Sequence, residues 1–146
     1  MQDIQSLFAD YASYHQTKGN KAYHRLGIPL IVLTLIGMLV RVKLFEAGGV
    51  RVDLAMLVIL FSTIFYLLEE WRLALAMLAI SVAFYFLGAA IPMWANVSLF
   101  ILGWIFQFIG HKVYEHKNPA FFRNFVHLLI GPLWILNDVV PVVKRP

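Results

Sequence analysis

Histidines are the side chains most capable of chemistry in this sequence, and three of them border apolar segments. His15 and His24 lie in the polar stretch YASYHQTKGNKAYH, and His111 ends a long uncharged run. Imidazole nitrogen and carboxylate oxygen form the donor set of non-haem iron and zinc centres. Because the chain has no cysteine, thiolate zinc sites, iron–sulfur clusters and thiol catalysis are excluded. These histidines therefore predict a metal centre.

Amide and carboxylate side chains accompany the three histidines. Asn20 lies within the first stretch, whereas Gln107 and Glu115 stand four residues before and after His111 and share its face on a helix. A ligand histidine needs a partner for the ring nitrogen that does not bind the metal. Asn20, Gln107 and Glu115 are candidates for that role, although a purely structural Glu115–His111 hydrogen bond is an equal alternative.

A bend is required between the first two histidines. On one continuous helix their nine-residue separation is about two and a half turns, which places them on opposite faces. Gly19 lies between them and permits a break in the helix. We therefore expect the chain to bend at Gly19, so that His15 and His24 face one point.

The remaining histidines, His116 and His127, receive no ligand role. His116 follows Glu115 and falls off the stripe that Gln107 and His111 share. A lone histidine near a membrane boundary is usually an amphipathic side chain at the headgroups. For His127, a buried and hydrogen-bonded position is the alternative.

Composition predicts that lipid is the solvent for most of this surface. The 146 residues are 61% hydrophobic and only 14% charged, whereas a soluble domain carries about 25% charged residues. Length favours a single integral-membrane domain over residues 1–146. The net charge of +4 suits anionic headgroups, and the scattered basic residues are not arranged for nucleic acid.

The apolar segments predict an all-α, polytopic membrane bundle. A spanning helix needs about 20 mostly apolar residues. Four spans are expected, with Pro92 and Asn96 breaking the uncharged stretch between the last two: 27–45, 53–69, 73–92 and 97–110.

Two further helical segments are expected at the membrane surface. The first is an N-terminal amphipathic helix, whose apolar stripe has helical spacing: Ile4, Leu7, Phe8, Tyr11 and Tyr14. Residues 121–143 are apolar but interrupted by polar residues and by Gly131–Pro132, which favours a re-entrant pair or an interfacial helix over a fifth span.

The distribution of basic residues predicts the orientation. With four spans, nine of the twelve lysines and arginines fall on one side and three on the other. Since basic residues are retained in the cytoplasm, both termini are expected there. The same topology gathers His15, His24 and His111 on the cytoplasmic face.

Two longer motifs resemble a known family. YHQTKGNKAYHRLGIPL fits the pattern His-x4-Asn-x3-His-x2-Gly-x-Pro. LGWIFQFIGHKVYEHKNPA fits Gly-Trp-x-x-Gln-Phe-x-Gly-His-x-x-(Phe/Tyr)-Glu-x-x-x-Pro-Ala, and RNFVHLLIGPLWILND continues the match. Together they resemble the fungal and bacterial membrane family of 2-hydroxy fatty acid dioxygenases.

The resemblance implies an Fe(2+)-dependent α-oxidation, in which a 2-hydroxy fatty acid and O2 give CO2 and the fatty acid one carbon shorter. His15, His24 and His111 match the family's histidines. Its polar partners, to which we assign catalytic roles, match Asn20, Gln107 and Glu115. A fourth protein ligand is left open between Glu115 and Asp138.

We expect a bacterial inner-membrane protein, or an endoplasmic reticulum protein if the source is eukaryotic. A di-metal hydroxylase or desaturase needs histidine boxes of the HxxxH and HxxHH type, which this chain lacks. A non-catalytic membrane scaffold or transporter with interfacial histidines remains the alternative.

Overall fold

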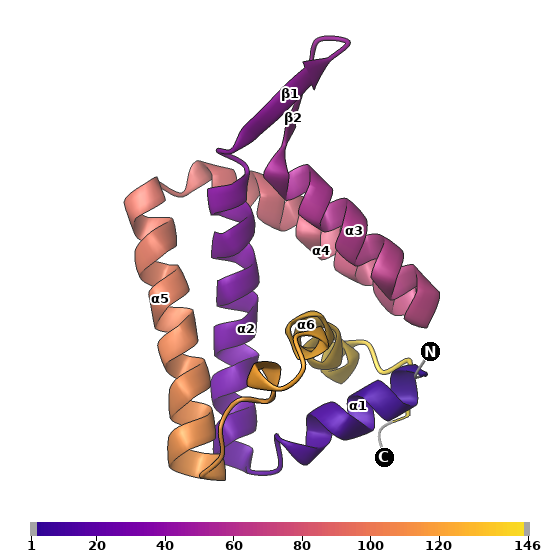
Figure 1. The fold of residues 1–146 in the computed structure, drawn as a ribbon, viewed down its shortest axis with the longest axis vertical. Coiled ribbons are helices and arrows are strands. Elements are labelled where there is room, and N and C mark those ends of the chain that lie inside the picture. The colour runs from indigo at the N-terminus through magenta and orange to yellow at the C-terminus, as the bar shows by residue number, and fades with distance from the viewer. Residues whose placement is uncertain (1–2, 145–146) are drawn as a thin grey trace. The chain divides into compact units, whose positions relative to one another are not determined.

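The structure, a computed structural model, describes residues 3–144, and most of them are helical (Figure 1). Helices α1 to α6 are joined by a β-hairpin, a π-helical turn (η1) and a 3-10 turn (η2). In chain order these elements are α1 (Ile4–Ser13), α2 (Lys18–Leu39), β1 (Lys43–Ala47), β2 (Val50–Asp53), α3 (Leu54–Glu69), α4 (Trp71–Ala90), α5 (Met93–Ile109), η1 (Gly110–Glu115), η2 (Ala120–Phe122) and α6 (Val126–Val139).

The chain divides into two compact units. The first comprises Met1–Pro29 with Leu102–Pro146, and the second comprises Leu30–Ile101. The boundaries between them fall inside α2 and α5. All three histidines of the predicted centre belong to the first unit, and the hairpin belongs to the second. The expectation of one membrane domain over residues 1–146 stays a prediction.

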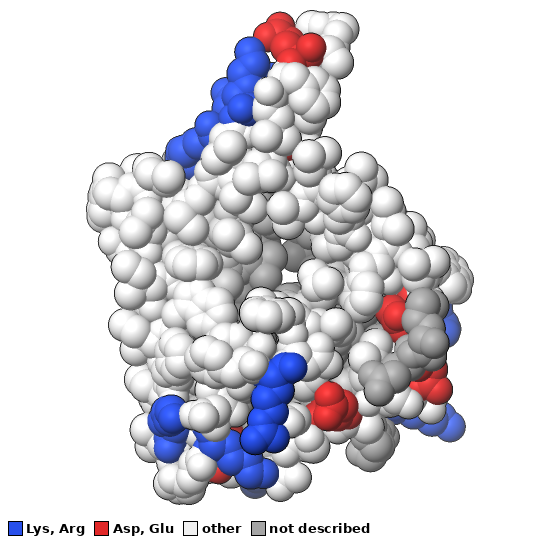
Figure 2. Space-filling model, in the orientation of Figure 1, with Lys and Arg blue, Asp and Glu red and all other residues white. Residues whose placement is uncertain are grey.

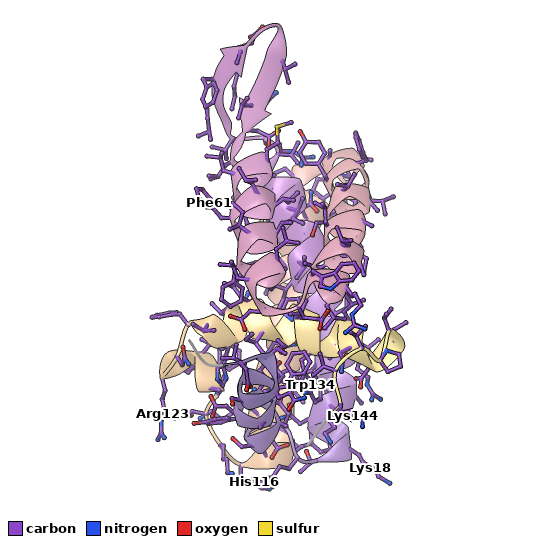
Figure 3. All side chains as sticks on the ribbon, turned by 90° about the vertical axis from the view of Figure 1, so that its right-hand side faces the viewer. Lys18, Phe61, His116, Arg123, Trp134 and Lys144 are labelled. Atoms are coloured by element: carbon purple, nitrogen blue, oxygen red, sulfur yellow. The ribbon has the colours of Figure 1, made fainter. Side chains whose placement is uncertain are left out.

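The expected N-terminal helix is present as α1, and its apolar stripe is buried. Asp3 caps it by accepting the backbone N–H of Ser6 at 2.7 Å. Four members of the stripe are buried, namely Ile4, Leu7, Phe8 and Tyr11. The stripe packs on α6, the helix that carries Trp134 (Figure 3). The Tyr11 ring lies 5.3 Å from that of Trp134. Contact with another helix, in addition to any lipid contact, therefore buries this face.

Helix α2 differs from the expected first span at both ends. It begins at Lys18, because the Thr17 hydroxyl accepts the backbone N–H of Asn20 at 3.2 Å in the manner of an N-cap. It ends at Leu39, so the extension of this span to residue 45 was wrong. The Arg41 guanidinium donates to the Gly37 carbonyl and so caps the last turn.

The segment after α2 is an antiparallel hairpin, which the all-α expectation did not include. Gly48 and Gly49 form its turn with φ angles of 56° and 78°, and such paired positive angles suit the twist of two strands. The sequence signal was available in Gly-Gly between alternating side chains. It was misinterpreted because Val42, Leu44 and Phe45 continue the apolar character of α2.

Helices α3 and α4 pack against each other in the second unit, and their ends agree with the expected spans within two residues. Asp53 caps α3 by accepting the Met56 N–H at 3.1 Å, and its other oxygen accepts the Tyr85 hydroxyl from α4. The carboxylate therefore joins the start of α3 to α4.

Glycines permit a close helix contact in the second unit. A Cβ at Gly88 would lie 2.7 Å from the Gly37 Cα, so α2 and α4 meet backbone to backbone. The Asn96 amide donates to the Gly88 carbonyl at 2.9 Å and thereby ties the first turn of α5 to the same point. Small residues and buried amides are typical of helix contacts in membranes.

Within residues 3–144, three helical segments are long and apolar enough to cross a membrane: Lys18–Leu39, Trp71–Ala90 and Met93–Glu115. Helix α3 is also apolar, but its 16 residues fall short of the roughly 20 that a perpendicular span needs. The count of four spans therefore stays a prediction.

The C-terminal apolar segment forms α6, which has 14 residues and accommodates Pro132. One side of α6 is buried in the first unit. Asn137 anchors the chain beyond the helix, since its amide donates to the Val143 carbonyl at 2.9 Å and its oxygen accepts the N–H groups of Val142 and Val143. The helix is too short for a span, and its expected place at the membrane surface stays a prediction.

Candidate metal centre

His15, His24 and His111 meet in the interior of the first unit. Their ring centroids lie 4.4 Å apart for His15 and His24, and 4.8 Å apart for each of the pairs with His111. Each ring is only 2% exposed. Each offers one ligand nitrogen, and the three nitrogens lie within 4.8 Å of one another. Two nitrogens bound to one ion are at most about 4.2 Å apart, so little inward movement is needed to bind a metal.

Backbone carbonyls fix the tautomers of two of these rings. The Nδ1 atom of His15 lies 2.7 Å from the Tyr11 carbonyl, and that of His24 lies 3.0 Å from the Asn20 carbonyl. A carbonyl oxygen only accepts hydrogen bonds, so each Nδ1 donates and each Nε2 keeps its lone pair. In both cases the ring donates to the carbonyl four residues earlier, and this hydrogen bond leaves Nε2 as a neutral nitrogen donor.

Buried nitrogen atoms without hydrogen-bond partners support a ligand-binding role. Over residues 3–144, the Nε2 of His15 and the Nδ1 of His111 are buried and have no hydrogen-bond partner. An unsatisfied buried polar atom costs about 1–3 kcal/mol. Coordination of a cation is one way in which this cost is recovered, and a three-nitrogen group fits Fe, Zn or Cu by ligand type.

The break between His15 and His24 occurs earlier than expected. Helix α1 ends at Ser13 and α2 begins at Lys18, so the bend lies at residues 14–17 and not at Gly19. Gly19 instead lies in the first turn of α2, where a Cβ would come within 2.1 Å of the Tyr114 ring. It serves close packing, whereas Thr17 supplies the cap that restarts the helix.

A π-helical turn carries the third histidine. Helix α5 passes at Gly110 into η1, whose wider turn includes His111. π-Helical turns within α-helices are often found at functional sites. A Cβ at Gly110 would lie 2.3 Å from Asn20 Oδ1 and 3.2 Å from His24 Nδ1. Glycine at this position therefore lets η1 approach α2 closely enough to bring His111 to the other rings.

Glu115 lies outside the three-histidine group. Its Oε1 accepts the Thr17 backbone N–H at 2.7 Å and the Thr17 hydroxyl at 3.1 Å. Glu115 thus holds the bend between the first two histidines to the end of the segment that carries the third. Its expected catalytic role stays a prediction.

The side-chain amides of Asn20 and Gln107 are buried, and each faces a glycine: Asn20 faces Gly110, and Gln107 faces Gly27. The Asn20 Nδ2 donates to the Tyr14 carbonyl at 3.2 Å and so closes the bend. Asn20 also orients His24 through its main-chain carbonyl, which the sequence alone did not suggest. Gln107 is 5% exposed, and its Nε2 would lie 2.3 Å from a Cβ at Gly27. Both amides keep their expected catalytic roles as predictions.

Two aromatic residues without a predicted role at the site lie beside His15. The Tyr11 ring stacks on His15 at 4.0 Å with only 12° between the planes. The Trp134 ring lies 6.1 Å from that of His15. These rings exclude water from His15, and burial is the largest cause that lowers its pKa from 6.5 to about 3; the nearby His111 ring lowers it further. His15 is therefore neutral near pH 7.

The other two histidines lie outside the group. His127 is buried, and its Nε2 is 2.7 Å from Asp10 Oδ2, which agrees with the alternative of a buried, hydrogen-bonded residue. His116 is exposed, with a φ of 55° at the end of η1. Asp138, the other open choice for a fourth ligand, pairs with Arg25 at 3.2 Å and is likewise not part of the group.

Residues 3–144 thus form a mostly helical protein with three candidate membrane helices and a buried three-histidine group. Residues 1–141 match the family described as "2-hydroxy-palmitic acid dioxygenase Mpo1-like", and the chain belongs to that family. It is 30% identical over 137 residues to 2-hydroxy-palmitic acid dioxygenase MPO1 of Saccharomyces cerevisiae, an alignment that covers 93% of this chain and 79% of the yeast protein. No solved structure matches the chain significantly. The family resemblance seen in the two sequence motifs is thus confirmed.

Proposed function

We propose that this protein is an Fe(II)-dependent dioxygenase of 2-hydroxy fatty acids. The reaction is R–CHOH–COOH + O2 → R–COOH + CO2 + H2O, in which the substrate loses four electrons and O2 accepts them. The balance requires no external reductant. The observation that carries the proposal is the buried group of His15, His24 and His111 in a chain that belongs to the dioxygenase family.

The three histidines would hold the ion through one imidazole nitrogen each. Ferrous iron, when bound, supplies Lewis acidity and redox chemistry toward O2 that side chains alone lack. Neutral imidazoles would leave the positive charge of the bound ion uncompensated, so the site would favour an anionic ligand such as a carboxylate. Three protein ligands also leave room for the hydroxyl and carboxylate oxygens of a 2-hydroxy acid.

The surrounding residues would keep this site ordered and dry. Tyr11 stacks on His15, and the Asn20 carbonyl holds the His24 ring. Glu115 holds Thr17 and so fixes the bend. Preorganised ligands lose little conformational entropy when metal and substrate bind. We assign Glu115 and the Asn20 main chain to this positioning role, and we assign the buried Gln107 amide to substrate positioning.

A lipid substrate accounts for the apolar character of the chain. The candidate spans at Lys18–Leu39 and Met93–Glu115 contain His24 and His111 near one end of each helix. A fatty acid with its head at the histidines would then keep its tail at membrane depth. We propose an integral membrane protein whose termini are cytoplasmic, in a bacterial inner membrane, or in the endoplasmic reticulum if the source is eukaryotic.

Oxygen uptake tests the proposed function. The purified protein is loaded anaerobically with Fe(II), mixed with 2-hydroxypalmitate and O2, and assayed for pentadecanoate by mass spectrometry. We expect one pentadecanoate per O2 consumed, and loss of turnover in His15→Ala, His24→Ala and His111→Ala. His116→Ala, which changes an exposed histidine, is the matched control and should keep its rate.

The same assay distinguishes the proposed enzyme from a non-catalytic scaffold or transporter. A scaffold or transporter would consume no O2 with the hydroxy acid and would carry no stoichiometric iron. Full turnover in all three histidine variants would show that the reaction takes place elsewhere.

A further inference from the structure

The β1–β2 hairpin has one apolar face and one charged face. Its register sets Phe45 opposite Val52 and Ala47 opposite Val50, so these four side chains share a face. Glu46 pairs with Arg51 on the other face.

The apolar face is open. Phe45 is 53% exposed and Val50 is 59% exposed. On the charged face, the Lys43 ammonium lies 2.9 Å from the Glu46 carboxylate. Lys43 and Arg51 outnumber the single exposed acid, and basic side chains follow one edge of the hairpin in Figure 2.

Local sequence specifies this hairpin strongly. The Gly48–Gly49 turn has the paired positive φ angles that two-residue hairpin loops favour. Leu44 forms a bulge between the pairs of Lys43 and Phe45, which increases the twist of the ribbon. Even so, a two-stranded hairpin alone in water is only marginally stable. A surface that covers its apolar face would stabilise it.

The hairpin is attached where the apolar helices end. It connects α2, a candidate membrane span, to the apolar helix α3. The buried Asp53 fixes its base, since that carboxylate caps α3 and accepts the Tyr85 hydroxyl of α4. Phe61, in the middle of α3, is 66% exposed, as expected of a lipid-facing side chain (Figure 3). With α2 across the bilayer as proposed, the base of the hairpin would fall at the level where hydrocarbon gives way to headgroups.

We propose that residues 43–53 bind the membrane interface. The face of Phe45, Ala47, Val50 and Val52 enters the boundary between acyl chains and headgroups, where aromatic and aliphatic side chains are favoured. Lys43 and Arg51 reach the phosphates of anionic lipids, each contributing attraction near the surface. The inference rests on the membrane insertion within the proposed function and is independent of the oxidation chemistry.

The absence of cysteine from the sequence makes the test direct, because any introduced cysteine is the only labelling site. Phe45→Cys and Glu46→Cys are labelled with a nitroxide and placed in phosphatidylcholine nanodiscs, with and without phosphatidylglycerol. Power-saturation measurements compare accessibility to O2, which concentrates in lipid, with accessibility to a water-soluble nickel chelate. Phe61→Cys provides the lipid-exposed reference.

The proposal predicts a several-fold higher ratio of oxygen to nickel accessibility at Phe45→Cys than at Glu46→Cys, close to the Phe61→Cys value and increased by phosphatidylglycerol. Val50→Cys and Arg51→Cys repeat the comparison if a label at position 45 prevents folding. Equal nickel accessibility on the two faces overturns the proposal, as does spin–spin broadening that shows a second copy covering Phe45. Nickel accessibility at Phe61→Cys would overturn membrane insertion as well, whereas loss of oxygen uptake alone would not affect the hairpin assignment.

Discussion

Glu115 accepts both the backbone N–H and the hydroxyl of Thr17, at 2.7 and 3.1 Å, across 98 residues of sequence. Thr17 lies in the bend between His15 and His24, and Glu115 lies one turn beyond His111. This contact therefore joins the two segments that supply the three rings. It assigns Glu115 to the support of the centre, because its hydrogen-bonding oxygen faces Thr17.

Substitution of Glu115 tests this positioning role. Glu115→Ala removes the acceptor for two donors of Thr17, and we expect a loss of about 1–3 kcal/mol in the free energy of unfolding together with weaker metal binding. Glu115→Gln keeps an oxygen that can accept both donors, so its stability and metal affinity should stay near those of the wild type. Chemical denaturation and Co(II) titration measure the two effects. Equal damage in the two variants would instead indicate that the carboxylate charge itself binds the metal.

Substitution of Gly110 tests the close approach of η1 to α2. The new methyl group of Gly110→Ala would lie 2.3 Å from Asn20 Oδ1, so we expect overpacking that costs about 1–3 kcal/mol and displaces His111. Asn20→Ala in the same chain removes the opposing atom. The double variant should recover metal affinity relative to Gly110→Ala, which a double-mutant cycle by metal titration measures. Strict additivity of the two single effects would contradict the contact.

The low pKa of His15 predicts a defined pH dependence for the metal-free protein. The folded chain protonates this residue only near pH 3, whereas the unfolded chain does so near 6.5. The contribution of His15 to the free energy of unfolding is thus fully present above pH 6.5. It is lost as the pH falls from 6.5 toward 3, by up to about 1.4 kcal/mol per pH unit. His15→Gln, which does not titrate, should show a shallower decline in unfolding free energy. Identical slopes for the two proteins between pH 6 and 4 would be inconsistent with a buried neutral His15.

The contact between Gly37 and Gly88 predicts a sensitive position in the second unit. A Cβ at Gly88 would lie 2.7 Å from the Gly37 Cα, so Gly88→Val should separate the helices and lower the thermal midpoint in detergent by several degrees. Phe86→Val alters a side chain on the same helix that is 68% exposed, and this control should change the midpoint little. Equal midpoints for the two variants would mean that the glycine contact does not support the fold.

The sequence predicted which three histidines lie together, because the relevant signals are local and chemical. Histidines without cysteine indicate the donor type, and basic residues indicate which polar segments share a side. The bend was predicted at Gly19, whereas the Thr17 cap decides where α2 begins. The contact of Tyr11 with Trp134 and that of Asp10 with His127 were not predicted, because each joins residues more than a hundred positions apart. The hairpin was missed since its apolar strand residues continue the composition of the preceding helix.

Iron stoichiometry decides whether His15, His24 and His111 form a ferrous centre. After anaerobic loading with Fe(II) and removal of excess metal, the wild-type protein should retain one iron per chain. His15→Ala, His24→Ala and His111→Ala should each retain almost none, whereas His127→Ala, which changes a buried histidine outside the group, should retain one if it folds. Full iron retention in the three variants, or no retention by the wild type, would contradict a ferrous centre built on these residues.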